Sequence, residues 1–246
     1  MAEDPSERAN EELRTFIYAV SHDLRSPLFS LSGFVNELRQ GLQILLEQVP
    51  PAVREQNAEL IDARILESLG YIERASGRLL TMTNSLLELG RLGRYELQPE
   101  PLAFPELVEE ILAGYAMQIR EKDISVHTHV CRNLTADRRA VNRILANLVD
   151  NAVKFAPART GEIRVHADCD GSTCRIQVSD NGPGMDPKTA EAVFEPFRRG
   201  VSPEIPGEGM GLAIVRSLAR RLGGDVTLKT APAKGAEFIV AIPSPE

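Results

Sequence analysis

Apolar residues recur at alternating steps of three and four along the first fifty residues of the chain. This spacing is typical of a coiled-coil seam, here sustained for about five heptads. Pro50 and Pro51 end it, because proline cannot donate a helical hydrogen bond and restrains the residue before it. The pattern predicts one long helix, whose seam consists of Leu13, Ile17, Val20, Leu24, Pro27, Leu31, Phe34, Leu38, Leu42, Leu45 and Val49.

A second periodic stretch follows the two prolines, with apolar positions from Ile61 to Leu89. The two stretches together predict a helical hairpin over residues 1–95. Two helices with narrow seams cannot enclose a core by themselves. We therefore predict a homodimer in which two hairpins form a four-helix bundle.

The pattern changes after residue 95, where helical periodicity begins to alternate with short strand-like runs. Asp-Gly, Gly-Pro and Gly-Gly pairs punctuate these segments, as turns do. We predict an α/β sandwich over residues 96–246 and an α+β fold class for the whole chain. The helical stretches lie near residues 105–120, 138–155, 187–193 and 210–222, and the strand-like runs are ISVHTHV, EIRVHAD, CRIQVSD, DVTLKT and EFIVAIP.

Composition and charge exclude several classes of protein. A net charge of −7 over 246 residues gives no global attraction to nucleic acid or anionic lipid. No apolar run approaches the roughly 20 residues that span a bilayer, and the acidic start MAEDPSER is not typical of a signal peptide. We therefore expect a cytoplasmic protein with no membrane segment in this chain.

The cysteines are three, an odd number without a CxxC pair, and fit a reducing compartment. Cys169 and Cys174 flank a predicted Asp-Gly turn, and we interpret them as small strand residues rather than as a disulfide. Cys131 would share one face of a strand with His127 and His129, a geometry compatible with a metal. No fourth ligand is evident, so we interpret these three as ordinary strand-surface residues.

The segment SHDLRSPL puts titratable side chains in the middle of the first predicted helix. His22 lies two residues after the seam residue Val20, so its imidazole should point away from the seam and into solvent. Asp23 can accept a proton from one ring nitrogen and make the other a better nucleophile, and Ser26 shares the face of His22. Pro27 would bend the helix beside the histidine. The alternative is a solvated polar face with an incidental proline.

The segment NLVDNAVKF lies late in the helix predicted near residues 138–155. It places Asn147 and Asn151 one turn apart on one face, with Lys154 three residues further. Two amide oxygens and a cation on one helical surface suit a polyphosphate with Mg²⁺, because Mg²⁺ prefers hard oxygen ligands and substrate phosphates.

Two glycine-rich segments follow. In DNGPGM, Asp180 ends a strand-like run, where its carboxylate can accept a hydrogen bond from an exocyclic amine, and the glycines let backbone approach a flat ligand. GEGMG leads directly into a predicted helix, whose free N–H groups and positive dipole end favour phosphate. Either segment alone is more often a turn, but the order and spacing of all the segments indicate a nucleotide site.

Five segments, in order, resemble those of the sensor histidine kinases of two-component signalling. SHDLRSPL is similar to the phosphoacceptor box, NLVDNAVKF to the asparagine box, DNGPGM and GEGMGLAIV to the two glycine boxes, and VFEPFRRG to the phenylalanine box. The resemblance runs from Glu12 to Pro243. It implies a dimerisation and phosphotransfer hairpin, followed by a Bergerat-type ATP-binding domain of the kind shared with gyrase and Hsp90-type ATPases.

The resemblance also implies a role for each matching residue. His22 would accept the phosphoryl group, with Asp23 as its acid/base partner, and Asn147 and Asn151 would hold Mg²⁺. A response-regulator aspartate would receive the phosphoryl group, and a sensory domain would lie upstream of this chain. The remaining ATP contacts would come from Lys154 toward phosphate, Asp180 toward the adenine amine, and Gly182, Gly184, Gly207, Gly209 and Gly211 around the cleft and lid.

The sequence departs from the family pattern at three points. Ser26 stands where many relatives have Thr or Asn to position a water, so the resemblance implies phosphatase activity less strongly. Ala236 replaces a common Thr or Ser in KGAEF and removes one hydroxyl contact. His22 and Arg91 are 69 residues apart, so the hairpin should be taller than is usual in the family.

Asn147 discriminates among the Bergerat enzymes. The ATP-hydrolysing relatives that resemble gyrase carry Glu there, and a carboxylate can act as general base toward water, whereas asparagine cannot. The γ-phosphate should therefore wait for a separate nucleophile, and His22 is the available one. Transfer would depend on positioning and on charge neutralisation by Mg²⁺ and Lys154, with Arg198 or Arg199 as further donors.

The sequence thus predicts a protein-histidine kinase core that binds ATP, phosphorylates His22 and passes the phosphoryl group to a response regulator. Two alternatives stay open. A degenerate scaffold would bind nucleotide and partner without phosphorylating. A Bergerat-type protein-serine kinase would have no reason to keep SHDLRSPL on a dimer seam.

Overall fold

The computed structural model describes residues 5–92, 96–131, 133–170, 172–198 and 209–244. Only the backbone is described for residues 5–17, 22, 89, 91, 92 and 133. The chain separates into two compact units, Met1–Arg94 and Tyr95–Glu246, so the division lies one residue from the predicted boundary. Among the described helices, none combines the length and the apolar character needed to cross a membrane.

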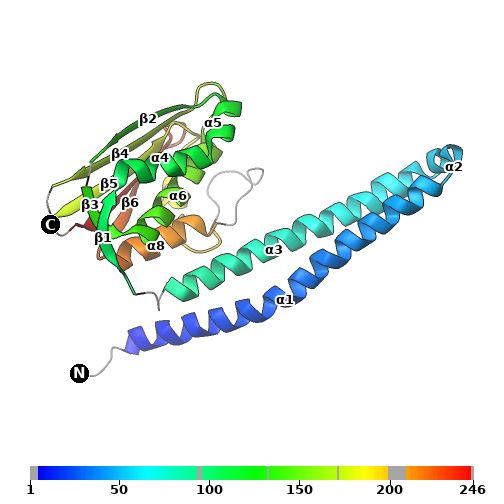
Figure 1. The fold of residues 1–246 in the computed structure, drawn as a ribbon, viewed down its shortest axis with the longest axis horizontal. Helices are drawn as coiled ribbons and strands as arrows, with labels where there is room; N and C mark the ends of the chain where they lie inside the picture. Colours follow the sequence, from blue (N-terminus) through cyan, green and yellow to red (C-terminus); the bar gives the residue numbers. More distant parts are fainter. Residues whose placement is uncertain (1–4, 93–95, 132, 171, 199–208, 245–246) are drawn as a thin grey trace. The chain divides into compact units, whose positions relative to one another are not determined.

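The first unit is a helical hairpin made of α1 (Pro5–Gln48), α2 (Pro51–Gln56), the π-helical η1 (Glu59–Leu66) and α3 (Glu67–Leu92). α1 and α3 pack along each other, and α2 and η1 join them (Figure 1). Val35 of α1 and Ser76 of α3 are almost completely buried midway along the hairpin. Beside them, Arg39 Nη2 and Glu73 Oε2 form a partly exposed ion pair at 2.8 Å between the two helices.

Most of the predicted seam of α1 faces away from α3, and its members Leu42 and Val49 are half-buried. The contact with α3 uses Val35 and Leu46, each of which lies one position after a seam residue. α1 therefore carries two apolar stripes, one covered by α3 and one left uncovered in the described chain. The uncovered stripe, called the outer stripe below, consists of Val20, Leu24, Leu31, Phe34, Leu38 and Leu45, whose exposed fractions run from 39% to 63%.

α1 continues through Pro27 instead of ending there. Proline cannot donate to the carbonyl four residues earlier, that of Asp23, and its ring crowds that carbonyl. Helices bend at such positions. Figure 1 shows α1 changing direction near its middle, in keeping with the bend predicted from the sequence.

The second unit contains two sheets. β1 (Pro99–Ala103) and β3 (Asn133–Asp137) pair antiparallel in the smaller one. The larger sheet has the strand order β2-β4-β5-β7-β6, in which β2 and β4 are parallel and the other neighbours antiparallel. The remaining elements are α4 (Phe104–Gly114), α5 (Ala116–Lys122), β2 (Ser125–Val130), α6 (Arg138–Phe155), β4 (Glu162–Cys169), β5 (Thr173–Asp180), α7 (Pro187–Ala192), α8 (Gly211–Arg221), β6 (Asp225–Thr230) and β7 (Ala236–Pro243).

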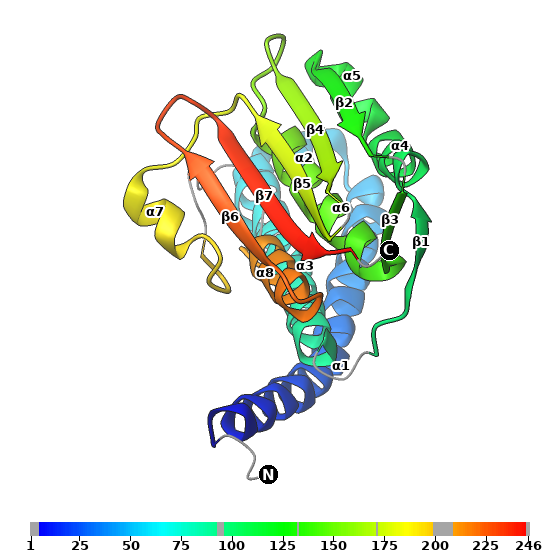
Figure 2. The same ribbon diagram turned by 90° about the vertical axis from the view of Figure 1, so that its left-hand side faces the viewer.

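The core lies between the five-stranded sheet and the helices α4, α6 and α8, which cover one face of it (Figure 2). Alternate strand residues point into this core: Val165 of β4 and Val178 of β5 are register partners, and each is 1% exposed. Ile144 on α6 is fully buried between them and the other helices. The unit is thus a two-layer α/β sandwich with one solvated sheet face, and the predicted α+β fold class is confirmed.

The start of α6 is fixed by Asp137. Its Oδ1 accepts a hydrogen bond from Ala140 N at 2.9 Å, which caps the helix, and its Oδ2 accepts one from Gln98 N at 2.8 Å. The cap therefore joins α6 to the segment that leads into β1. It sets the rotation of α6, and with it the face on which the two predicted asparagines lie.

The interpretation of Cys169 and Cys174 as unbonded residues is wrong, because their Sγ atoms are joined in a disulfide. The two residues are register partners in the β4–β5 hairpin, with Cα atoms 4.0 Å apart. Side chains of directly opposed residues leave the sheet on the same face and lie side by side.

Candidate functional site

Asp180 occupies the last position of β5, at the edge of the core. Its Oδ1 accepts a hydrogen bond from Gly182 N at 2.8 Å. Burial raises the pKa of the Asp180 carboxyl, and hydrogen bonds from the backbone of Gly182 and Ala236 partly oppose that rise. The structure thus holds a partly buried carboxylate in a fixed orientation, as recognition of an amine donor requires.

The loop after Asp180 approaches other backbone so closely that only glycine fits. A Cβ at Gly182 would lie 2.7 Å from Phe155 O, at the end of α6. Gly184 has a φ of +63°, and a Cβ there would clash with Ala231 O in the turn between β6 and β7. The loop is therefore clamped between α6 and that turn.

The turn between β6 and β7 makes further hydrogen bonds to this loop that sequence reasoning missed. Gly235 N donates to Gly182 O at 3.0 Å, and Met185 N donates to Thr230 Oγ1 at 2.9 Å. Thr230 Oγ1 in turn donates to Gly235 O at 2.7 Å. The glycine in KGAEF was the available signal, because a glycine directly before a strand often marks a close backbone approach.

The asparagines of α6 lie next to the start of α8. Asn147 Nδ2 donates to Arg143 O at 2.7 Å, which leaves Oδ1 as its open acceptor. A Cβ at Gly211 would lie only 2.8 Å from that Oδ1, so Asn147 and the first residue of α8 are in contact. Asn151 lies one turn further along α6 and is half-buried. Two amide oxygens on this face are hard ligands of the kind that Mg²⁺ accepts.

Lys154 does not stand free on this face. Its Nζ forms an ion pair with Asp150 Oδ2, one turn earlier on α6, at 2.5 Å. The predicted contact of Lys154 with phosphate would require this pair to open or to be shared. The sequence contained the signal, since Asp and Lys four residues apart on a helix commonly pair.

The N-terminus of α8 supplies donors for an anion. α8 begins at Gly211, and no side chain caps it at Met210. The first N–H groups of an uncapped helix and its dipole together attract phosphate. Gly209 has a φ of +70° and accepts a hydrogen bond from Phe197 N at 2.9 Å, whereas Gly207 lies outside the described residues.

The phenylalanine segment packs against the core at one end only. The rings of Phe194 and Phe238 meet edge to face at 6.3 Å, and the Arg216 guanidinium lies 5.5 Å from the Phe194 centroid. Phe197 is 41% exposed. Arg198 forms an ion pair with Glu195 at 2.9 Å, and the other predicted donor, Arg199, lies outside the described residues.

In the hairpin, the backbone of His22 is helical, but its side chain lies outside the described atoms, so its predicted exposure stays a prediction. Asp23 and Ser26 are both exposed on α1. Arg25, between them, donates from Nη2 to Asn84 Oδ1 on α3 at 2.6 Å. This bond ties the segment SHDLRSPL to α3.

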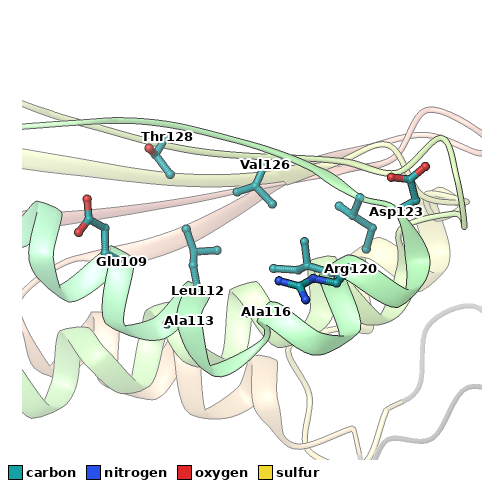
Figure 3. A pocket seen from close by; sticks show the side chains of 10 residues that line it. Glu109, Leu112, Ala113, Ala116, Arg120, Asp123, Val126 and Thr128 are labelled. Carbon is teal, nitrogen blue, oxygen red and sulfur yellow. The ribbon is translucent and has the colours of Figure 1, made fainter.

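Two cavities lie elsewhere in the α/β unit. One, of about 600 Å³, is open to solvent and lies between α4, α5 and β2, with Leu112 and Val126 on opposite walls (Figure 3). The other, of about 460 Å³, includes Asp180 in its wall. Most of its lining comes from strand residues on the sheet face opposite to the core, such as Arg164, Ser179 and Glu237. Neither contains Asn147, Asn151 or Gly211, so neither is the predicted nucleotide site.

Comparison with known protein families distinguishes histidine kinases from the other proteins that share this type of ATP-binding domain. Residues 12–94 match the His Kinase A (phospho-acceptor) domain, and residues 136–246 match the histidine kinase-, DNA gyrase B-, and HSP90-like ATPase domain. The chain belongs to the histidine kinases. The resemblance read from the five segments is confirmed, and so is the assignment of an ATP-binding domain.

The histidine kinase relatives are larger than this chain. It is 32% identical over 247 residues to an uncharacterised sensor-like histidine kinase of Rhizobium meliloti, which covers 97% of this chain and 44% of that protein. It is 34% identical to the methanogenesis regulatory histidine kinase FilI of Methanothrix harundinacea, over 97% of this chain and 25% of the relative. The chain thus spans less than half the length of these curated relatives.

Solved structures of histidine kinases show the same fold. Full-length ShkA in complex with AMPPNP aligns over 94% of this chain and 46% of ShkA, with a TM-score of 0.68 and 27% identity. The histidine kinase ThkA in complex with the response regulator protein TrrA aligns over 97% of this chain and 65% of ThkA, with a TM-score of 0.64 and 22% identity.

Proposed function

We propose that this chain is the catalytic core of a sensor histidine kinase that transfers the γ-phosphoryl group of ATP to His22 and then to an aspartate of a response regulator. The observation that carries the proposal is the assembly of three predicted nucleotide contacts in one unit. Asp180 lies at the end of β5, Asn147 lies on α6, and the uncapped α8 starts in contact with Asn147.

The two ends of ATP would be recognised by different chemistry. Asp180 would accept a hydrogen bond from the exocyclic amine of adenine, in the loop shaped by Gly182 and Gly184. The N–H groups at the start of α8 would receive the phosphates. Mg²⁺, held by Asn147 and Asn151 together with phosphate oxygens, would neutralise charge on the polyphosphate.

The transfer step needs a nucleophile from the hairpin. An imidazole nitrogen of His22 forms a bond to the γ-phosphorus while the bond from that phosphorus to the β,γ-bridging oxygen breaks, and ADP leaves with the electron pair. The other ring nitrogen gives its proton to Asp23, which is exposed beside it on α1. Asn147 favours this route over hydrolysis, because an amide cannot activate water as a general base.

The outer stripe supports the proposal of a homodimer. Phe34 and Leu38 are each more than 60% exposed, at 63% and 61%, although they lie on a regular heptad pattern. A contiguous apolar stripe of this kind marks an interaction surface in a soluble protein. A second copy of the hairpin offers an identical stripe and would complete a four-helix bundle around a two-fold axis.

The experiment that tests the proposal is incubation of the purified chain with γ-labelled ATP and Mg²⁺. We expect acid-labile, alkali-stable label that His22→Gln abolishes, with nucleotide affinity unchanged. His127→Gln is the matched control, because its ring is exposed on the other unit and should not matter. Label that persists in His22→Gln would overturn the acceptor assignment, and acid-stable label would indicate a serine kinase.

The same experiment addresses the degenerate scaffold and the partner. Nucleotide binding by the wild-type chain without any labelling would favour a scaffold over a kinase. Addition of candidate receiver domains to the labelled chain should move label to an aspartate of the cognate regulator. Loss of label as free phosphate would show the phosphatase activity, and Ser26→Ala should slow that loss because its hydroxyl would orient water.

A further inference from the structure

Cys131 lies together with Cys169 and Cys174, which follow it by 38 and 43 residues, at one end of the five-stranded sheet. Cys131 follows the last residue of β2, Cys169 ends β4, and Cys174 lies at the start of β5. Their Sγ atoms all lie within 4.8 Å of one another. In Figure 2 the arrowheads of β2 and β4 point to this end of the sheet, and that of β5 points to the other.

Cys131 does not share its surroundings with the two histidines before it on the strand. Its backbone N–H donates to Ala167 O at 3.0 Å, and its Sγ lies 2.7 Å from Cys169 Sγ and 3.9 Å from Cys174 Sγ. The His129 ring instead stacks on the His166 ring at a centroid distance of 5.2 Å. The sequence placed Cys131 on one strand face with His127 and His129. In the structure, Cys131 instead belongs to a cluster of three sulfur atoms.

The cluster has two redox states. In the structure Cys169 and Cys174 form a disulfide, and Cys131 is a free thiol beside it. A dithiol or phosphine reductant that supplies two electrons, with two protons from water, converts the disulfide into two thiols and is itself oxidised. The reduced protein then presents three thiols in one place, two of them half-buried and one, Cys174, fully buried.

We propose that in the reduced protein Cys131, Cys169 and Cys174 bind one soft metal ion, of the class of Zn²⁺ or Cu⁺, through three thiolates. Thiolate ligands select such ions, whereas hard cations such as Mg²⁺ prefer oxygen. Within the described residues, the cluster contains three sulfur ligands and no fourth side chain of metal-binding type. The ion would therefore be three-coordinate, or would take water as a fourth ligand, and each thiol that binds it releases its proton to solvent.

The surroundings of the cluster agree with this assignment. Asp168, whose carboxylate interacts electrostatically with Cys131, adds negative charge beside the cluster. Negative charge there favours a bound cation. The half-buried Cys131 and Cys169 give the ion access from solvent, and Cys174 anchors it against the core.

The proposed site is separate from the nucleotide site. Cys174 and Asp180 lie near opposite ends of β5, and six residues at the usual strand rise put them about 20 Å apart. Loss of the metal should therefore leave ATP affinity unchanged. Gain of the metal should raise the melting temperature of the α/β unit, because it ties β2 to the β4–β5 hairpin and binds only the folded state.

The test is titration of the full chain, reduced with a phosphine under anaerobic conditions, with Zn²⁺ and with Cd²⁺ as a spectroscopic substitute. We expect one ion per chain and an ultraviolet thiolate-to-Cd²⁺ absorption. Cys131→Ser should lower the metal affinity at least about tenfold. Loss of a residue that merely orients a metal ligand already costs about that much, and loss of the ligand itself should cost no less. The oxidised protein, which retains one free thiol, should not bind.

His129→Ala is the matched control, because it removes a metal-binding type of side chain that the structure places on His166 and not on the cluster. Cys131→Ser is the decisive variant, since Cys131 is outside the disulfide and its replacement keeps nearly the same size. Retained ATP binding would show that this variant is folded. The proposal is overturned if the reduced wild-type chain binds no ion, or if His129→Ala loses as much affinity as Cys131→Ser.

Discussion

The α/β unit and the helical hairpin bury their apolar side chains in opposite ways. In the α/β unit, Ile144, Ile176 and Val240 are each 0% exposed. In the hairpin, the large apolar side chains of the outer stripe remain exposed in the single chain. A unit with its own core can be stable alone, whereas the stability of the hairpin depends on what covers its stripe. The two units should therefore respond differently to the same kind of substitution.

The largest effect should come from the core of the α/β unit. Ile144→Ala removes a fully buried side chain from α6 and should lower the free energy of unfolding by about 2–5 kcal/mol, measured by chemical denaturation. Met117→Ala, at a side chain that is 73% exposed, is the control and should change it by less than about 0.5 kcal/mol. Equal effects of the two would mean that the sandwich core is not as described.

A substitution in the outer stripe should act through association. Phe34→Asp places a charge on the stripe and should weaken dimerisation by at least about 2 kcal/mol, which is more than tenfold in the dissociation constant. Sedimentation over a range of concentrations measures it, with the exposed Gln40→Asp on the same helix as control. A wild-type chain that stays monomeric at all concentrations would contradict the four-helix bundle.

Two glycines allow a direct comparison of the units. Gly184→Ala forces a side chain into a φ of +63° and into Ala231 O, so the free energy of unfolding should fall by about 1–3 kcal/mol and ATP affinity should fall with it. Gly33→Ala meets nothing within 4 Å inside α1 and should stabilise the hairpin by up to about 1 kcal/mol. Thermal melts of both variants measure these two changes in stability. If both variants were stabilised, or both destabilised, the expected difference between the units would be refuted.

The smallest effect concerns pH. Because the pKa of Asp180 is raised in the folded state, its stability contribution is complete below the unfolded pKa and is lost as pH rises through the folded pKa. Asp180→Asn should therefore unfold at slightly higher denaturant than the wild-type chain at neutral pH, with the difference closing below roughly pH 4. Its ATP affinity should nevertheless fall about 10- to 100-fold, because a charge-assisted hydrogen bond is lost. A stability difference that grows toward low pH would contradict a raised pKa of Asp180 in the folded state.

Much of the fold could be predicted because the pattern of apolar residues is local. All five strand-like runs are strands, and α6 spans the predicted 138–155. β1 could not be found in this way, because PEPLA contains two prolines and its pairing with β3 depends on residues 30 to 38 positions away. The helix expected near 105–120 is two helices, α4 and α5, separated at Tyr115, and Gly114 directly before it was the available signal for the break.

Parts of the candidate site could be predicted from local sequence, and other parts could not. The contact of Asn147 with Gly211 and the position of Asp180 follow from segments whose order resembles a known family. The Lys154–Asp150 pair was readable from helical spacing alone. The sulfur cluster was not, because it depends on the register of three strands and on the way the chain turns after β2, neither of which a one-dimensional pattern specifies.

The position of Asp180 bears on how the kinase would respond to the energy state of a cell. In the proposed mode of binding, Asp180 and its clamped glycine loop would hold the base, which is common to ATP and ADP, whereas the start of α8 and the Mg²⁺ on α6 would contact the phosphates. ADP should therefore remain a strong competitor after each transfer. We expect the rate of labelling to follow the ratio of ATP to ADP more closely than the concentration of ATP itself.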